Sequence, residues 1–247
     1  DEKYSLQVNL SRNSSDNNFK YPGNTEERNS NGEYYNTSLN TTFGYKIDSK
    51  NILKFYSQFY DSERHFSLTS PNATRTKYHD FNTRNLLEWE STFDRFTSRL
   101  RTAHIGESYK YFPSIDSELF TYGKVETAII KYDLAFDLND KIKLNSIIDY
   151  NRNQGYGSSI NNTKREIGSA SLLLRHFVSD KWDYTTSVRQ EITDKYGNPF
   201  LFSFGTQYKF TNYYRLKLNL SKNFRMPTYN DLFWEGSGNP DLKPETS

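Results

Sequence analysis

Apolar and polar side chains alternate along most of the chain, with the two-residue period of a β-strand. In the first such stretch, Leu6, Val8 and Leu10 share one face, while Gln7 and Asn9 lie on the other. The same alternation returns after each polar connection, and it predicts about eleven strands. We expect them over residues 4–10, 33–47, 52–66, 78–93, 96–106, 119–138, 142–150, 165–178, 182–188, 202–210 and 214–222.

The connections between these strands alternate between two kinds. Short turn sequences stand at 48–50, 94–95, 139–141, 179–181 and 211–212, and longer polar loops at 11–32, 67–77, 109–116, 152–164 and 195–199. If consecutive strands pair, the sheet is antiparallel and all the long loops lie at one end. Short turns at one end and long loops at the other are typical of outer-membrane barrels. The pattern therefore predicts an all-β fold, an antiparallel up-and-down transmembrane β-barrel.

The composition fits this prediction once the alternation is taken into account. The 247 residues are 17% aromatic, and the mean hydropathy is −0.91. A barrel strand turns only alternate residues toward lipid, so its mean hydropathy is low. Ten aromatic residues lie within a few positions of the tight turns, where an interfacial belt is expected. They are Phe43, Tyr45, Phe93, Phe96, Phe136, Phe177, Trp182, Tyr184, Phe210 and Tyr214.

The same numbers argue against several classes of function. No cysteine is present, which excludes disulfides and thiolate chemistry. The net charge of +2 gives no reason to expect nucleic-acid binding. Only four histidines occur and none stands in a catalytic motif, so we expect neither an enzyme nor a bound cofactor.

The segment from Phe224 to Glu245 has no strand or helix period of its own. Prolines and glycines punctuate it, so it cannot form one long element. They are Pro227, Gly236, Gly238, Pro240 and Pro244. The stretch YNDLFW between them is long enough for about one helical turn, with Thr228 as its N-cap. We therefore expect a structured loop.

This segment resembles the FRAP…NPxLxPE box of TonB-dependent receptors, the energised importers of the Gram-negative outer membrane. The matching residues are Phe224, Arg225, Pro227, Asn239, Pro240, Leu242, Pro244 and Glu245. Met226 stands where the family usually has alanine. We refer to residues 224–247 as the box segment.

The resemblance implies that residues 1–247 are part of the β-barrel domain of such a receptor. The family barrel has about 22 strands, of which this chain would supply about half. The plug domain and the C-terminal strands of the family are expected to be absent from this chain. The whole receptor would contact outer-membrane lipid and, through the plug, the TonB–ExbB–ExbD complex.

The ligand that the resemblance implies is a scarce small molecule, such as a metal chelate. We expect a ferric siderophore first, with cobalamin and then haem as alternatives. A passive porin or an adhesin on the same barrel architecture is the alternative of a different class. The match to the FRAP…NPxLxPE box argues against both a porin and an adhesin.

Two sets of residues are candidates for binding. Tyr229, Phe233 and Trp234 offer aromatic surface for a ligand. His65 and His79 flank one long loop and could hold a metal or haem iron, although exposed loop histidines are the simpler interpretation. Haem receptors of the family carry a histidine between the two halves of the box, and residues 228–238 contain none. We expect Arg225 and Glu245 to hold the shape of the loop.

Overall fold

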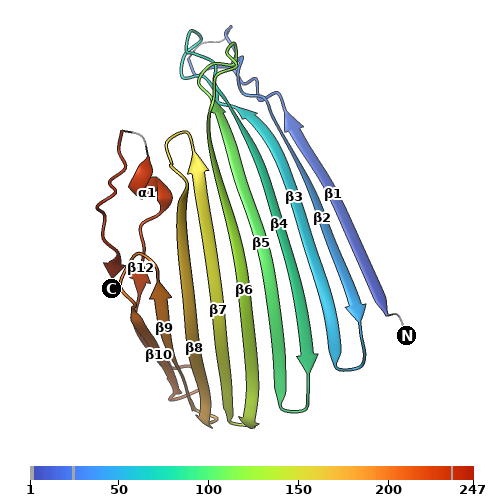
Figure 1. Cartoon of the computed structure of the whole chain (residues 1–247), viewed down its shortest axis with the longest axis vertical. Coiled ribbons are helices and arrows are strands. Elements are labelled where there is room, and N and C mark those ends of the chain that lie inside the picture. Colours follow the sequence, from blue (N-terminus) through green and yellow to red (C-terminus); the bar gives the residue numbers. More distant parts are fainter. Residues whose placement is uncertain (1–2, 24–25, 235) are drawn as a thin grey trace.

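The computed structural model describes residues 3–23, 26–234 and 236–247. Eleven of its strands form one antiparallel sheet, and each strand pairs with the next one in the sequence (Figure 1). The strands are β1 (Tyr4–Ser15), β2 (Tyr34–Lys46), β3 (Asn51–His65), β4 (Lys77–Thr92), β5 (Phe96–Phe112), β6 (Thr121–Asn139), β7 (Ile142–Gly157), β8 (Thr163–Ser179), β9 (Trp182–Thr193), β10 (Phe200–Lys209) and β11 (Arg215–Lys222). This confirms the predicted up-and-down meander.

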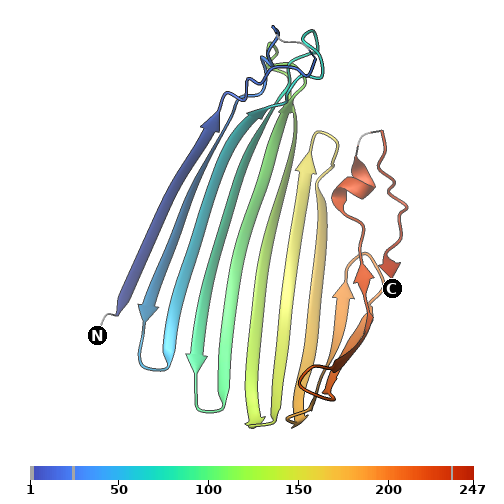
Figure 2. The same ribbon diagram turned by 180° about the vertical axis from the view of Figure 1, so that it is seen from behind.

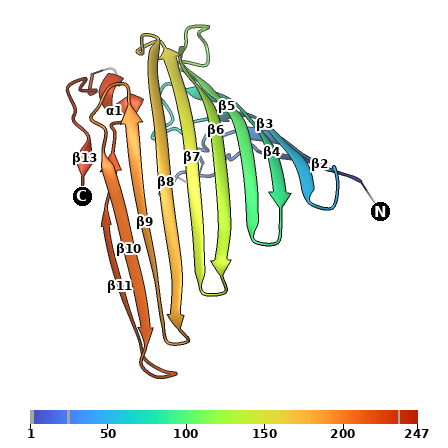
Figure 3. The same ribbon diagram turned by 60° about the horizontal axis from the view of Figure 1, so that its bottom comes forward.

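The sheet is a single curved layer (Figure 3). Because apolar and polar residues alternate along each strand, one face of the sheet is apolar and the other is polar. On one face, which we call the apolar face, large side chains are exposed; Leu218 and Leu220 are both 60% accessible. Among the described residues, only Leu68, Pro227 and Leu232 are buried apolar side chains. This arrangement is typical of a barrel wall in a membrane. The apolar side chains contact lipid and therefore need no protein core.

The other face, the polar face, carries charges that neutralise one another across strands. Arg101 Nε donates to Glu88 Oε2 over 2.6 Å, and Arg189 Nη1 donates to Asp149 Oδ2 over 3.0 Å. Glu88 and Asp149 are each only 8% exposed. These pairs satisfy the buried carboxylates; the first ties β4 to its neighbour β5, and the second reaches from β9 across β8 to β7.

The tight turns all lie at one end of the sheet (Figure 2). Four of them are closed by a side-chain oxygen that accepts from the backbone two and three residues on. The acceptors are Asp48 Oδ1, Asn139 Oδ1, Ser179 Oγ and Thr211 Oγ1. The turns predicted at 48–50, 139–141, 179–181 and 211–212 are therefore present, and each is closed by a local side-chain hydrogen bond.

At the opposite end, which we call the long-loop end, several strands run farther than predicted. β1 extends to Ser15, β5 to Phe112, β7 to Gly157 and β9 to Thr193. In these extensions apolar and polar residues do not alternate, because both faces of the sheet can contact water there. The backbone hydrogen bonds between the strands nevertheless continue. As a result, the connection 158–162 is no longer than the tight turn 210–214.

Two asparagines join the first two long loops. Asn29 and Asn31 are 1% and 0% exposed. Asn31 Nδ2 donates to the carbonyl oxygens of Phe66 and Thr76, at 2.9 and 3.0 Å, and Leu68 N donates to Asn29 Oδ1. The loops at this end are therefore held together by buried polar contacts.

Candidate ligand-binding site

The box segment leaves the sheet and closes on itself. Its two ends form a small ladder in which β12 (Phe224–Arg225) pairs with β13 (Glu245–Thr246). Between them lies α1 (Tyr229–Phe233). The two halves of the sequence box, about twenty residues apart, thus meet side by side.

α1 is the helical turn predicted from the sequence, and Thr228 is its N-cap. Asp231 N donates to Thr228 Oγ1 over 3.1 Å, and Thr228 N donates to Asp231 Oδ2 over 2.8 Å. This reciprocal pair is a capping box. The hydrogen bond from the Thr228 backbone holds the pKa of the Asp231 carboxyl below its usual range.

The returning chain packs closely against the end of α1. Gly238 N donates to Trp234 O over 2.6 Å. A Cβ at Gly238 would lie 2.5 Å from Trp234 N. Only glycine fits there without a shift of the backbone.

The segment is fixed to the polar face of β7 and β8. The Tyr229 ring lies over Gly155, where a Cβ would stand 3.0 Å from the ring, and its hydroxyl donates to Asn153 O over 3.2 Å. Arg165 Nη2 donates to Pro227 O over 2.8 Å, and its guanidinium lies 5.1 Å from the centre of the Tyr229 ring. Burial raises the pKa of the Tyr229 phenol, against the opposing effect of the Arg165 charge. These contacts decide where α1 sits.

A cavity of about 670 Å³ opens between α1 and the long-loop ends of the strands. Seven of its thirteen lining residues are aromatic: Phe66, Tyr78, Tyr109, Tyr111, Tyr122, Phe233 and Trp234. The others are Pro113, Thr121, Ser158, Ser159, Ile160 and Asn230. None of the described lining residues carries a formal charge. Such a surface suits a ligand with apolar or π-bonded faces and hydrogen-bonding edges.

The aromatic side of the cavity is ordered by ring contacts. Tyr78 and Tyr109 stack with centroids 5.1 Å apart and planes 14° apart. Phe66 meets Tyr78 and Tyr111 edge-on, at 6.2 and 6.3 Å. The Arg64 guanidinium lies 4.9 Å from the centre of the Tyr78 ring. The rings therefore form a preformed platform.

The structure brings together two of the three aromatic candidates of the box. Phe233 and Trp234 line the cavity, whereas Tyr229 does not and instead contacts β7 and β8. Ligand contact by these residues stays a prediction. Sequence reasoning missed the strand aromatics Tyr78, Tyr109 and Tyr111. Tyr78 stands on the polar parity of its predicted strand, whereas Tyr109 and Tyr111 fall in the predicted loop 109–116, for which no strand parity was predicted.

Arg225 and Glu245 face one another across the small ladder of β12 and β13. Arg225 Nη1 lies 3.7 Å from Glu245 Oε2, and the two side chains are 68% and 77% exposed. A solvent-exposed pair at this distance contributes little free energy. The backbone pairing holds the box halves together more firmly than the charges do.

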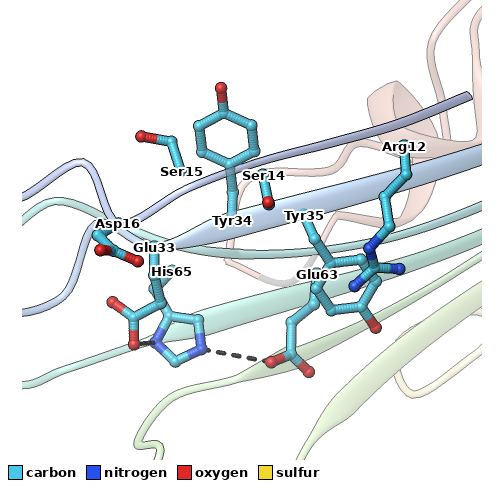
Figure 4. A pocket seen from close by; sticks show the side chains of 9 residues that line it. All are labelled: Arg12, Ser14, Ser15, Asp16, Glu33, Tyr34, Tyr35, Glu63 and His65. Carbon is cyan, nitrogen blue, oxygen red and sulfur yellow. Dashed lines mark hydrogen bonds and ion pairs between the residues drawn. The ribbon is translucent and has the colours of Figure 1, made fainter.

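The two candidate histidines are each engaged with carboxylates. His65 Nδ1 lies 3.0 Å from Glu33 Oε1, and its Nε2 lies 3.4 Å from Glu63 Oε1 (Figure 4). His79 Nε2 lies 2.9 Å from Asp61 Oδ1. Within the described part of the chain, no group of three or more His, Cys, Asp or Glu side chains is arranged to hold a metal. A metal at His65 or His79 gains no support from this geometry.

A curved one-layer sheet with an apolar outer face and a loop folded onto its polar face defines the class of outer-membrane barrel receptors. The model of the family "TonB dependent receptor-like, beta-barrel" matches residues 1–247. The chain therefore belongs to this family, whose members are transporters and receptors of the Gram-negative outer membrane and not enzymes. The apolar face is the lipid side and the polar face lines the lumen.

Among curated proteins, the chain is similar to two vitamin B12 transporters named BtuB. The one from Photobacterium profundum is 28% identical over 161 residues, which are 62% of this chain and 25% of the relative. The one from Vibrio vulnificus is 32% identical over 104 residues, which are 40% of this chain and 17% of the relative. The chain thus spans about a quarter or less of these relatives.

Solved structures show the same fold at low identity. The siderophore receptor PirA from Pseudomonas aeruginosa aligns with a TM-score of 0.78 at 14% identity, over 100% of this chain and 45% of that one. The copper transporter OprC aligns with a TM-score of 0.72 at 13% identity, over 98% of this chain and 46% of that one. These likenesses support the barrel architecture and leave the ligand open.

Proposed function

We propose that the receptor to which this chain belongs binds a scarce nutrient in the aromatic cavity and imports it with energy from the TonB complex. The observation that carries the proposal is the cavity itself, formed jointly by the barrel wall and the box segment. It lies at the long-loop end, which faces the outside in barrels of this kind. The whole receptor would add a plug domain and further strands, consistent with the partial coverage of its relatives.

Among the ligand classes, cobalamin fits the cavity better than a ferric siderophore. A ferric catecholate is an anion, and an anion is recognised best by arginine or lysine. None of the described lining residues has such a charge, and the Arg64 guanidinium, which lies against the Tyr78 ring, is paired with Asp80 Oδ2 at 3.9 Å. A corrinoid presents a flat ring system with amide edges, which aromatic faces, hydroxyls and the Asn230 amide can meet. The names of the curated relatives point the same way.

The test is ligand binding by the purified full-length receptor, with cyanocobalamin and a ferric catecholate siderophore as probes. We expect cyanocobalamin to bind, and Trp234→Ala to raise its Kd about tenfold, as loss of a central aromatic contact does. Tyr213→Ala is the matched control, because Tyr213 is 100% exposed in a tight turn at the opposite end. Binding of the siderophore without cyanocobalamin would overturn the cobalamin assignment and restore the siderophore.

The energised mechanism needs a separate measurement. We expect cells carrying the receptor to accumulate the bound nutrient, and a protonophore to stop accumulation without changing surface binding. Uptake that persists without the proton-motive force, together with steady ion conductance in planar bilayers, would favour a passive porin. A receptor that binds a macromolecule and accumulates no nutrient would favour an adhesin.

A further inference from the structure

Two glycines on the polar face of the wall each lie beneath a tyrosine ring. Gly155 on β7 lies under Tyr229 of the box segment, and Gly123 on β6 lies under Tyr109 of β5. Both glycines are buried. The register of β6 and β7 places them in adjacent rows of that face. The ring of Tyr109 therefore rests on bare backbone, in the same manner as the ring that docks the box segment.

The Tyr109 ring occupies the space that a side chain at Gly123 would fill. A Cβ there would lie 2.5 Å from Cε1, 2.9 Å from Cζ and 3.1 Å from the hydroxyl oxygen of Tyr109. The two residues stand directly opposite each other in the ladder of β5 and β6, so the ring leans across the strand pair. A ring that covers a cross-strand glycine packs against backbone that would otherwise be left open.

Neither backbone conformation nor close strand approach accounts for the glycine at position 123. Among the described residues, the glycines with positive φ are Gly23 and Gly236, so Gly123 has the extended backbone of its strand, which any residue can adopt. The three atoms nearest to its Cβ position all belong to the Tyr109 side chain, whereas at Gly157 the nearest atoms are backbone. Glycine also weakens the interior of a strand. What Gly123 provides in return is room for the ring.

We propose that Gly123 is a positioning residue of the nutrient cavity. Tyr109 lines that cavity and stacks on Tyr78, and the seat on Gly123 holds it in this stack, which is the platform that a flat ligand face meets. A side chain at position 123 would turn the ring off the backbone of β6 and displace the stack. The inference rests on the proposed function for its ligand, whereas the seat is a property of the wall without ligand.

The first measurement needs no ligand. The full-length receptor carries fluorotyrosine at position 109 alone, and its fluorine NMR resonance is recorded in detergent with and without Gly123→Ala. Because the ring current of Tyr78 acts on a stacked neighbour, we expect this substitution to shift the resonance. Gly168→Ala is the matched control, since a Cβ at Gly168 meets nothing within 4 Å, and it should leave the resonance in place. An unshifted resonance in Gly123→Ala would overturn the proposal.

The second measurement is the Kd of cyanocobalamin, or of the ferric catecholate if that probe is the one bound, by isothermal titration. We expect Gly123→Ala to raise the Kd about fivefold, the size of one aromatic pair. In a Tyr109→Ala background the same substitution should add nothing, because the ring that it displaces is gone. Equal losses in both backgrounds would assign Gly123 to the backbone and overturn the proposal. If neither probe binds the wild type, the proposed function fails, and the fluorine resonance still decides the seat of Tyr109.

Discussion

The eleven-stranded sheet and the box segment are built on different principles. In the sheet, each strand pairs with its neighbour in sequence, and tight turns set the register. In the box segment, a short helix and two short strands are placed by contacts with β7 and β8, more than 60 residues away. The sheet is a periodic structure held by local pairing, whereas the box segment is an aperiodic structure held by a few long-range contacts.

This difference shows where the receptor is sensitive to substitution. A sheet of many equivalent ladders distributes its stability, so one altered side chain has a limited effect. The box segment depends on Gly155, Arg165 and Pro227, and each of these contacts occurs once. Changes at the docking contacts should therefore move α1, and with it Phe233 and Trp234, without unfolding the wall.

The largest effect is expected from Gly155→Val. The new side chain would occupy the space of the Tyr229 ring, since even a Cβ would stand 3.0 Å from it. We expect ligand affinity to fall more than tenfold, a loss above about 1.4 kcal/mol, because α1 cannot dock.

The control is Gly168→Val on the next strand, where a Cβ meets nothing within 4 Å. Isothermal titration with the full-length receptor compares the two variants. An unchanged affinity in Gly155→Val would show that the docking of Tyr229 does not shape the cavity.

An intermediate effect is expected from acid, through the capping box. The folded state lowers the pKa of Asp231, so its contribution to loop stability is complete above the unfolded pKa of about 3.9. It is lost as the pH falls through the lowered folded pKa. We expect ligand affinity to hold at pH 5 and to decline a few fold below pH 4. The measurement is Kd against pH for wild type and for Asp231→Asn, which cannot titrate. The same decline in both would assign the acid step to another group.

The smallest effect is expected from Arg225→Ala. The exposed pair with Glu245 contributes about 0.5 kcal/mol or less, so ligand affinity should change less than about twofold. Uptake assays in cells run beside the titration. Lower uptake with unchanged affinity would support a role for Arg225 in the shape of the loop, and loss of affinity in a folded variant would assign it to ligand contact.

Some features of the site were within reach of the sequence and others were not. The capping pair of Thr228 and Asp231 is local, so a four-residue window suffices to predict it. The strand extensions at the long-loop end were not predictable from alternation, since both faces are wet there and the apolar signal disappears. The contact between Tyr229 and Gly155 was not predictable for another reason. Glycine has no side chain, so its residue type does not indicate that a ring packs against it.

The sequence by itself determined the meander, the two kinds of connection, the apolar face and the family box, because each depends on residues that are near one another in the chain. Only the tertiary structure decided which aromatic residues share a cavity and that Tyr229 contacts the wall. Those facts depend on which strands become neighbours and in what register. Cross-strand pairing brings together residues that no local pattern connects.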